Sequence, residues 1–243
     1  MRSDTSINPV THGLRPVFGR RQRNKIDKLL RIKAAARHLF VYRGYDDTTT
    51  REIALRAGVG MGTVFIYAAN KRDLLFLIAN EDLEQVTRRA SASVSEKTSL
   101  IGNLLGIARC HYEYFRLQPD LSKLMLREML FYDSGQQADR FKTTREDVIA
   151  MMAQAVQYAK DSRSIKTSES TQVVGWMLFC IYQVELRHWL ATDPSSLEAG
   201  LRRLARMFRL AITGMAPAPA SIQRRSQRAK LAPSSNKPRP RKK

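Results

Sequence analysis

Residues that could do chemistry are sparse in this 243-residue sequence, and their spacing argues against an enzyme. The four histidines do not stand at metal-ligand spacing with one another, with cysteine or with carboxylates. Cys110 and His111 are neighbours in sequence, so on a helix they would point in different directions. The chain also lacks a phosphate-binding glycine loop and a nucleophile elbow. We therefore expect no catalytic residue, no metal and no cofactor.

The segment from Thr48 to Lys71 holds residues that could bind an anion. Thr49 and Glu52 have the spacing of a capping box, in which a hydroxyl accepts from the Glu52 N–H and the carboxylate reaches back. A helix N-terminus with hydroxyls and free N–H groups also suits a phosphate. Capping and phosphate binding are compatible, and the sequence leaves both open for Thr49.

Two short helical patterns flank Gly58, and neither is long enough to be stable alone. The first has Ile53 and Ala54 for its buried face, and the second extends from Gly60 to Tyr67. Two helices joined by a short glycine-containing turn form a helix-turn-helix, which presents its second helix to the major groove of DNA. On spacing alone, an ordinary helical corner is an equal alternative.

The apolar periodicity predicts helices along most of the chain, and no stretch alternates as a strand would. We predict an all-α fold of about nine helices, with an N-terminal three-helix domain that contains the helix-turn-helix and a larger helical domain for ligand binding and dimerisation. The predicted helices cover 20–43, 49–56, 60–67, 71–94, 100–117, 120–131, 138–159, 168–192 and 195–213. The predicted domains are a flexible arm over 1–19, a DNA-binding domain over 20–75, a body over 76–215 and a disordered basic tail over 216–243.

The net charge of +20 lies mainly at the two ends of the chain. Residues 216–243 hold nine Lys and Arg and no acidic residue, whereas 76–215 are nearly neutral. Such a distribution indicates a polyanionic partner. If the tail binds DNA, it should do so without sequence preference, and its removal should flatten the salt dependence of binding.

A longer pattern extends over residues 26–75. It comprises Ala35, Leu39 and Phe40 in "AAARHLF", then Gly44-Tyr45, Thr48-Thr49, Ile53-Ala54, Ala57-Gly58-Val59, Gly62-Thr63, Lys71 and Leu74. In these residues the segment resembles the N-terminal domain of the tetracycline-repressor (TetR) family of bacterial transcriptional regulators. The resemblance implies a homodimer with one helix-turn-helix per subunit and an effector pocket in the body.

The resemblance also implies the residues that meet DNA, and three positions depart from the family pattern. Phe65 stands where the family commonly has an aromatic hydroxyl, Gly60 where it has serine, and Ala68 where it has an aromatic residue. Because the second helix lacks Arg, Lys, Asn and Gln, we expect base recognition to depend on Thr63, apolar contacts, Arg51 and DNA shape. The predicted DNA-binding residues are Thr48, Thr49, Arg51, Gly60, Met61, Gly62, Thr63, Ile66, Tyr67 and Lys71.

The body offers weaker indications of an effector site and a dimer interface. Its aromatic and methionine residues lie at helical spacing, which is typical of a core, although some could line an apolar pocket. The candidates for effector binding are His111, Tyr112, Trp176 and Gln183. The segment "VVGWMLFCIYQVELRHWL" is apolar around much of its circumference, and family analogy favours dimer contacts through about 168–213. We expect both cysteines to be buried free thiols.

The main hypothesis is a ligand-responsive repressor that binds a near-palindromic DNA operator as a homodimer. Its small-molecule effector would be partly apolar. The alternative is a nonspecific or architectural nucleic-acid binder driven by its basic ends; a helical enzyme or adaptor is a third class. The sequence has no run of about 18 apolar residues, so we expect no membrane partner. A cytoplasmic, nucleoid-associated bacterial protein is expected.

Overall fold

The computed structural model describes residues 19–192, 194 and 196–214, and in these ranges it contains nine helices and no strand. The all-α prediction is therefore confirmed for the described part of the chain. The predicted arm (apart from Gly19) and the predicted tail lie outside it. The helices are α1 (Arg20–Tyr42), α2 (Thr50–Arg56), α3 (Met61–Phe65), α4 (Lys71–Ala92), α5 (Leu100–Phe115), α6 (Pro119–Glu128), α7 (Ala138–Asp161), α8 (Thr171–Thr192) and α9 (Leu197–Thr213).

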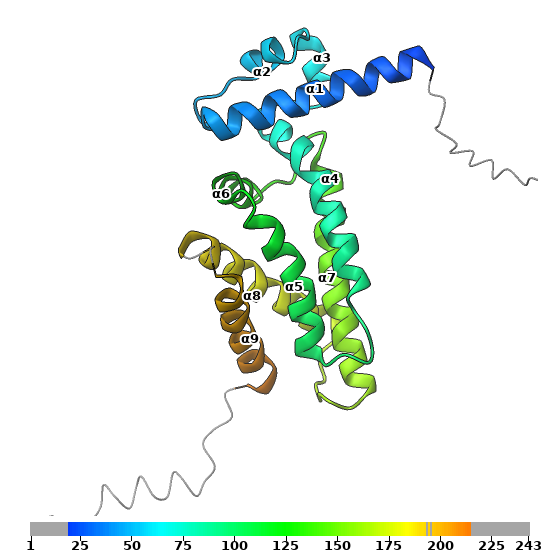
Figure 1. Ribbon diagram of the computed structural model, residues 1–243. Helices are drawn as coiled ribbons and strands as arrows, with labels where there is room; N and C mark the ends of the chain where they lie inside the picture. Colours follow the sequence, from blue (N-terminus) through cyan, green and yellow to red (C-terminus); the bar gives the residue numbers. More distant parts are fainter. Residues whose placement is uncertain (1–18, 193, 195, 215–243) are drawn as a thin grey trace, which may run out of the picture.

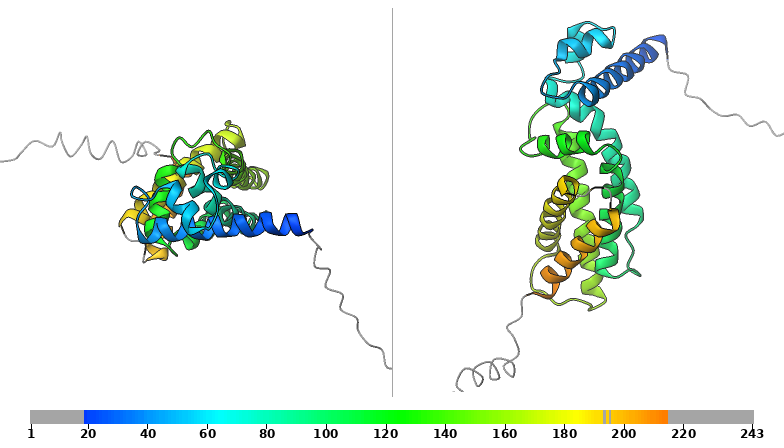
Figure 2. Two further views of the ribbon diagram at one scale, coloured as in Figure 1. Left: turned by 90° about the horizontal axis from the view of Figure 1, so that it is seen from above. Right: turned by 60° about the vertical axis from the view of Figure 1, so that its left-hand side comes forward.

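The molecule is elongated, with α1–α3 at one end and a helical body below them (Figure 1). α1 lies across the top of the body, and α2 and α3 pack on its far side (Figures 1 and 2). α4 descends from this end along α5 and α7, and α8 and α9 complete the body. The C-terminal end of α9 is therefore far from α2 and α3 (Figure 2).

The first helix follows the predicted apolar stripe for most of its length. Ile32, Ala36 and Phe40 are buried against the other helices of this end. Leu30, although apolar, is 57% exposed. The helix ends as predicted at Gly44, whose φ of +93° lies in the left-handed region that favours glycine.

The core of the body depends on close approaches between helices. At Gly175 of α8, an added Cβ would lie 2.8 Å from the Ala153 backbone nitrogen of α7, so only glycine allows this spacing. Trp189 is fully buried, stacks on the Tyr112 ring at 4.5 Å and lies against Gly200 of α9. These contacts join α5, α7, α8 and α9 into one core.

Several predicted details are wrong. The predicted second short helix over 60–67 is shorter, since α3 ends at Phe65 and a turn follows. The predicted helix over 120–131 ends at Glu128, and Phe131 has a φ of +57°. Neither thiol is fully buried: Cys110 is half-buried and Cys180 is exposed.

The predicted domain boundary between residues 75 and 76 falls inside α4, which extends continuously from the α1–α3 end into the body. The boundary stays a prediction. In the described ranges no helix is long and apolar enough to cross a membrane.

Candidate nucleic-acid interface and ligand cavity

The start of α2 is held by a capping box at Thr49 and Glu52, as the spacing predicted. The Thr49 Oγ1 accepts from the Glu52 N–H at 3.2 Å, and the Glu52 carboxylate accepts from the Thr49 N–H at 2.9 Å. These hydrogen bonds from Thr49, with a smaller contribution from Arg43, lower the pKa of Glu52. The Thr49 hydroxyl also lies 2.9 Å from the same carboxylate, so a phosphate would have to share this hydroxyl with Glu52.

Thr48 does not stand where a phosphate contact requires it. Its side chain is buried, and its hydroxyl donates to the Gly44 carbonyl at 2.6 Å, with the Leu39 carbonyl at 3.3 Å. The residue therefore ties the end of α1 to the start of α2. A DNA contact at Thr48 stays a prediction, and in this conformation its hydroxyl is enclosed by the backbone that it stabilises.

The turn between α2 and α3 depends on Gly58 and on an arginine that the sequence analysis overlooked. Gly58 has a φ of +61°, as a tight turn requires. The Arg31 guanidinium donates to the Ala57 carbonyl at 3.0 Å, and an added Cβ on Gly58 would lie 3.2 Å from its Nη1. Arg31 thus anchors the turn to α1 and fixes the direction in which α3 leaves it.

The short helix α3 has one buried side chain and an open outer surface. Val64 is fully buried, as predicted, whereas Gly60, Gly62 and Ile66 are exposed. Met61 and Thr63 are half-buried. The predicted contact residues on this helix are therefore accessible, and Arg51 on α2 is exposed as well.

Two predicted backbone-contacting residues already have partners inside the protein. The Tyr67 hydroxyl donates to the Lys25 carbonyl of α1 at 3.1 Å. The Lys71 ammonium donates to the carbonyls of Tyr45 at 2.8 Å and Asp46 at 3.1 Å. Both residues brace the α1–α3 end, and a DNA phosphate would compete for their donors.

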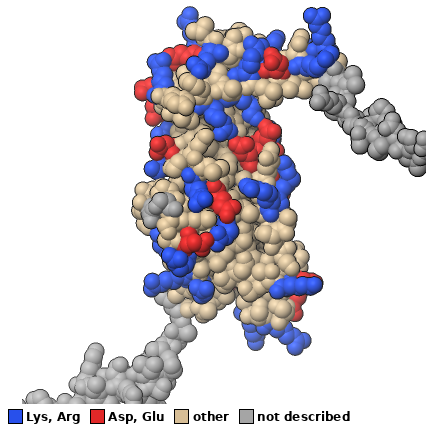
Figure 3. Space-filling model, in the orientation of Figure 1, with Lys and Arg blue, Asp and Glu red and all other residues tan. Residues whose placement is uncertain are grey.

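Basic residues gather at the free end of α1 (Figure 3). Arg20, Arg21, Arg23 and Lys25 are all exposed there. Acidic side chains stand between basic ones elsewhere on the α1–α3 end (Figure 3). The start of α1 therefore offers a cationic surface beside the helix-turn-helix.

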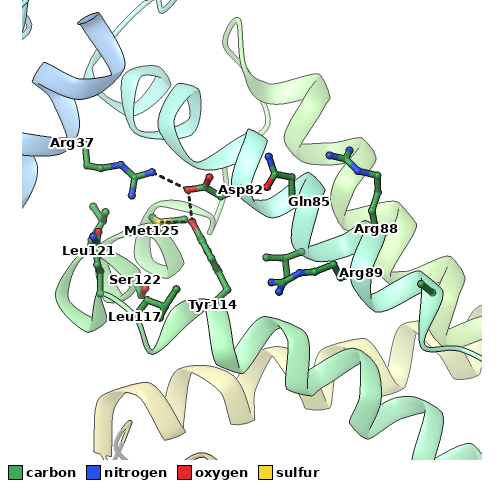
Figure 4. Close-up of a pocket in the computed structure, with 13 residues that line it drawn as sticks. Arg37, Asp82, Gln85, Arg88, Arg89, Tyr114, Leu117, Leu121, Ser122 and Met125 are labelled. Carbon is green, nitrogen blue, oxygen red and sulfur yellow. Dashed lines mark hydrogen bonds and ion pairs between the residues drawn. The ribbon is translucent and has the colours of Figure 1, made fainter. Parts of the chain in front are cut away.

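Ion pairs join α1 to the body at an open cleft of about 780 Å³. Arg37 of α1 donates to the Asp82 carboxylate of α4 at 2.8 Å, and the Tyr114 hydroxyl of α5 reaches the same oxygen at 3.5 Å (Figure 4). Burial, followed by the Asp82 charge, raises the pKa of Tyr114, so the phenol remains a donor. Lys33 of α1 also pairs with a carboxylate of α4. This cleft marks the seam between the two parts of the molecule.

The segment between α6 and α7, residues 129–137, forms direct hydrogen bonds with the end of α3 and the turn after it. Gln136 Nε2 donates to the Phe65 carbonyl at 2.9 Å, and Gln137 Nε2 donates to the Tyr67 carbonyl at 2.9 Å. Arg72 of α4 donates to the carbonyl of Glu128, the last residue of α6, immediately before this segment. The position of α3 therefore depends on how residues 129–137 lie.

Asp73 is the buried centre of this contact. Its carboxylate accepts from the N–H groups of Ala69 and Gln136, each at 2.9 Å, and from the Tyr132 hydroxyl. An added Cβ on Gly135 would lie 2.2 Å from the Asp73 Oδ1, and Gly135 has a φ of +128°. The sequence analysis identified Asn70 and Asp73 only as a helix start, which is confirmed by the Asn70 cap. Spacing gave no signal for the long-range partners of Asp73.

A cavity of about 410 Å³ lies in the body among α4–α8. His111, Trp176 and Gln183, three of the four predicted effector-binding residues, line it. Tyr112 does not, because its ring is buried against Trp189. Most of the lining is apolar, including Leu83, Phe115, Leu126, Met129, Leu130, Phe131, Phe141, Val148, Phe179 and Val184.

The wall of this cavity includes the start of the 129–137 segment, since Met129, Leu130 and Phe131 line it. The same segment holds the end of α3 through Gln136 and Gln137. The cavity and the outer surface of α3 are thus connected through nine consecutive residues. His111 in the cavity is buried, and its Nδ1 lies 2.9 Å from the Ile107 carbonyl. Burial lowers its pKa to about 4, so the ring is neutral near pH 7.

The exposed faces of α8 and α9 carry large apolar side chains. On α8, Val173 and Val184 are 55% and 65% exposed, and Trp176 and Met177 are also exposed. Leu210 and Met207 add to them on α9. Trp176 was expected among core residues, but it lies at the surface and on the rim of the cavity.

Comparison with known proteins agrees with this architecture. Residues 32–78 match the family described as "Bacterial regulatory proteins, tetR family". This segment of the chain therefore resembles the tetR family. The matched residues cover the buried part of α1, the helix-turn-helix and the first part of α4. Members of this family are regulators, in agreement with the expectation that the chain is not an enzyme.

Two proteins of Bacillus subtilis (strain 168) resemble this chain in sequence. The "Fatty acid metabolism regulator protein" is 29% identical over 90 residues, which are 37% of this chain and 46% of the relative. The "Uncharacterized HTH-type transcriptional regulator YvkB" is 34% identical over 98 residues, which are 40% of this chain and 50% of the relative. The chain thus spans about half the length of the curated relatives that it matches.

A solved structure extends the resemblance to the body. The Thermus thermophilus FadR, a TetR-family transcriptional repressor in complex with lauroyl-CoA, is 25% identical and has a TM-score of 0.59. The match covers 79% of this chain and 98% of that structure. The arrangement of both the helix-turn-helix and the helical body is therefore similar to that of this repressor, which was solved with a ligand bound.

Proposed function

We propose that the protein is a DNA-binding repressor whose affinity for its operator is controlled by a ligand in the α4–α8 cavity. The observation that carries this function is the connection through residues 129–137. Met129–Phe131 line the cavity, and Gln136 and Gln137 hold the end of the exposed helix α3. A ligand that displaces one end of this segment acts on the other end.

α3 is the proposed recognition helix, with Thr63 as its polar base-contacting residue. Arg51 and the α2 N-terminus at Thr49 would meet the backbone or nearby base edges, with Gly60, Met61, Gly62 and Ile66 close to the groove. Tyr67 and Lys71 would reach phosphates only by sharing donors that now brace α1. The basic start of α1 supplies sequence-independent attraction, which weakens as salt rises.

We expect a homodimer formed through about 168–213. The exposed apolar side chains of α8 and α9 support it, because a surface of this kind favours a second copy. Two-fold symmetry of the protein would then be mirrored in the operator, with two α3 helices in successive major grooves. A regulator of this kind would lie on the bacterial nucleoid.

The proposed effector is a fatty acyl compound. One curated relative is a fatty acid metabolism regulator, and the Thermus repressor holds lauroyl-CoA. The cavity of this chain is mostly apolar and falls within the usual size range of ligand pockets. A ligand lowers operator affinity only by the difference between its affinities for the DNA-competent and DNA-incompetent conformations.

Selection of bound sequences from random duplex DNA at physiological salt tests the function. The expected result is a symmetric consensus whose complex survives excess random DNA and is released when a fatty acyl ligand, either lauroyl-CoA or dodecanoate, is added. A nonspecific binder driven by its basic ends would give no consensus and would be removed by random DNA. The matched protein ending at residue 215 separates the contribution of the basic tail, since its loss should weaken binding to all sequences alike.

A further inference from the structure

The apolar cavity contains a cation without an acidic partner. Arg187 of α8 lines the cavity, and its guanidinium donates to Gln183 Oε1 at 2.6 Å and to the carbonyls of Gln183 and Leu126 at 2.8 and 3.4 Å. All three acceptors are neutral. No Asp or Glu of the described residues forms an ion pair with it. Burial lowers the pKa of Arg187, and Tyr182 offsets this desolvation only in part.

Two polar atoms of the cavity wall lack hydrogen-bond partners. Arg187 Nε and Thr87 Oγ1 are both buried, and neither has an acceptor or donor in the described part of the chain. Thr87 belongs to α4 and lines the same cavity from another side. A buried donor without a partner destabilises the folded state, so such atoms are rare without a reason.

A structural role alone does not account for this arrangement. Arg187 does link α8 to the α6 carbonyl of Leu126, but a neutral donor could do the same without bringing an unpaired charge into an apolar wall. Elsewhere in the body, Arg203 pairs with Glu185 at 2.7 Å, as a partly buried arginine usually does. Arg187 therefore differs from its neighbour in lacking the anion.

We propose that the cavity takes an amphiphile with a carboxylate head, which binds Arg187 and Thr87, and an apolar chain that packs on the aromatic and aliphatic lining. The planar guanidinium matches a carboxylate, and the unpartnered Nε–H and hydroxyl are donors that the head would satisfy. This inference rests on the proposed function, since it takes the cavity as the effector site. It specifies that the head group of the fatty acyl effector is a free carboxylate. A thioester group has no negative charge at this position.

Calorimetric titration of the full-length protein with dodecanoate and with dodecan-1-ol, both below their micelle concentrations, tests the head group. The two ligands share a chain and differ in charge. Dodecanoate should bind on the order of tenfold to a hundredfold more tightly, as expected for a charge-assisted hydrogen bond in a desolvated site. Arg187→Met should abolish the difference, and Arg187→Lys should keep part of it.

Arg145 provides the matched control, because it lines the same cavity and its guanidinium lies 5.9 Å from the centre of the Phe141 ring. Arg145→Met should preserve the preference for dodecanoate. Thr87→Val should reduce it severalfold, and this variant keeps the proposal testable if Arg187→Met does not fold, which a thermal melt would show.

Equal affinities for dodecanoate and dodecan-1-ol in the wild-type protein would overturn the carboxylate site. Loss of the preference in Arg145→Met but not in Arg187→Met would overturn it as well. If lauroyl-CoA releases operator DNA while dodecanoate does not bind, the proposed function stands and only this inference fails.

Discussion

The helix-turn-helix and the helical body are held together in different ways. At the α1–α3 end, backbone groups are satisfied by nearby side chains, such as the Thr49–Glu52 capping box and the Arg31 contact with the turn. In the body, aromatic side chains that are distant in sequence form the core, as Tyr112 and Trp189 do. The comparison teaches that hydrogen bonds from side chains to backbone groups define the geometry of the DNA-binding end, whereas packing determines the shape of the ligand-binding part.

The strongest test of this difference is Trp189→Ala. Removal of a fully buried indole should lower the free energy of unfolding by about 3–5 kcal/mol, because it leaves a cavity between α5, α8 and α9. Urea denaturation followed by circular dichroism would measure it. Trp176→Ala is the control, since that side chain is 51% exposed and should matter far less. Similar losses for both variants would contradict a body held by its core.

The pH dependence of stability should reveal the buried His111. Its folded-state pKa of about 4 lies below the unfolded value near 6.5, so the unfolded state binds the proton first as the pH falls. The contribution is fully present above pH 6.5 and is lost progressively down to about pH 4, by about 3 kcal/mol in total. Unfolding measured across this range should be less pH-dependent in His111→Gln. An unchanged profile in that variant would refute the assignment.

The contact between the two regions should be sensitive to Asp73→Asn. The amide cannot accept equally from the Ala69 and Gln136 N–H groups and the Tyr132 hydroxyl, so unfolding should become easier by about 2 kcal/mol. Operator affinity should fall too, as the end of α3 loses its support. Fluorescence anisotropy with labelled operator would measure it, with exposed Asp133→Asn as the control. Unaltered operator affinity would show that α3 does not need this support.

The smallest expected effect is at the cap of α2. Thr49→Ala should reduce the free energy of unfolding by about 1 kcal/mol, because the Glu52 N–H loses its acceptor. Thr49→Ser retains the hydroxyl and should be nearly neutral. The difference should shrink in acid: the pKa of Glu52 is lowered in the folded state, so its stabilising effect is lost as the pH falls through that value. A loss equal for both substitutions would argue against the cap.

The features that the sequence predicted, and those it did not, differ in how far apart the interacting residues lie in the chain. The capping box, the glycine turn at Gly58 and the buried Val64 were predictable because their partners are a few residues away. The roles of Tyr67 and Lys71 were not, since their acceptors are carbonyls 42 and 26 residues away in the sequence.

In the body, helical periodicity predicted the helices but not which side chains face the cavity. Tyr112 and His111 are adjacent on α5, and only the positions of α7 and α8 decide that His111 lines the cavity while Tyr112 stacks on Trp189. Arg187 could not be identified at all, because its distinguishing property is the lack of a nearby carboxylate, which a linear sequence does not reveal.

The glycine at position 175 determines where the cavity can expand. With the backbones of α7 and α8 already in contact there, those two helices have no room to move closer and share a tightly fitted seam. We expect a bulky ligand to displace the irregular stretch after α6 around Met129, which lines the cavity, more readily than this seam. Binding of a large ligand should therefore displace residues 129–137, which hold the proposed recognition helix α3.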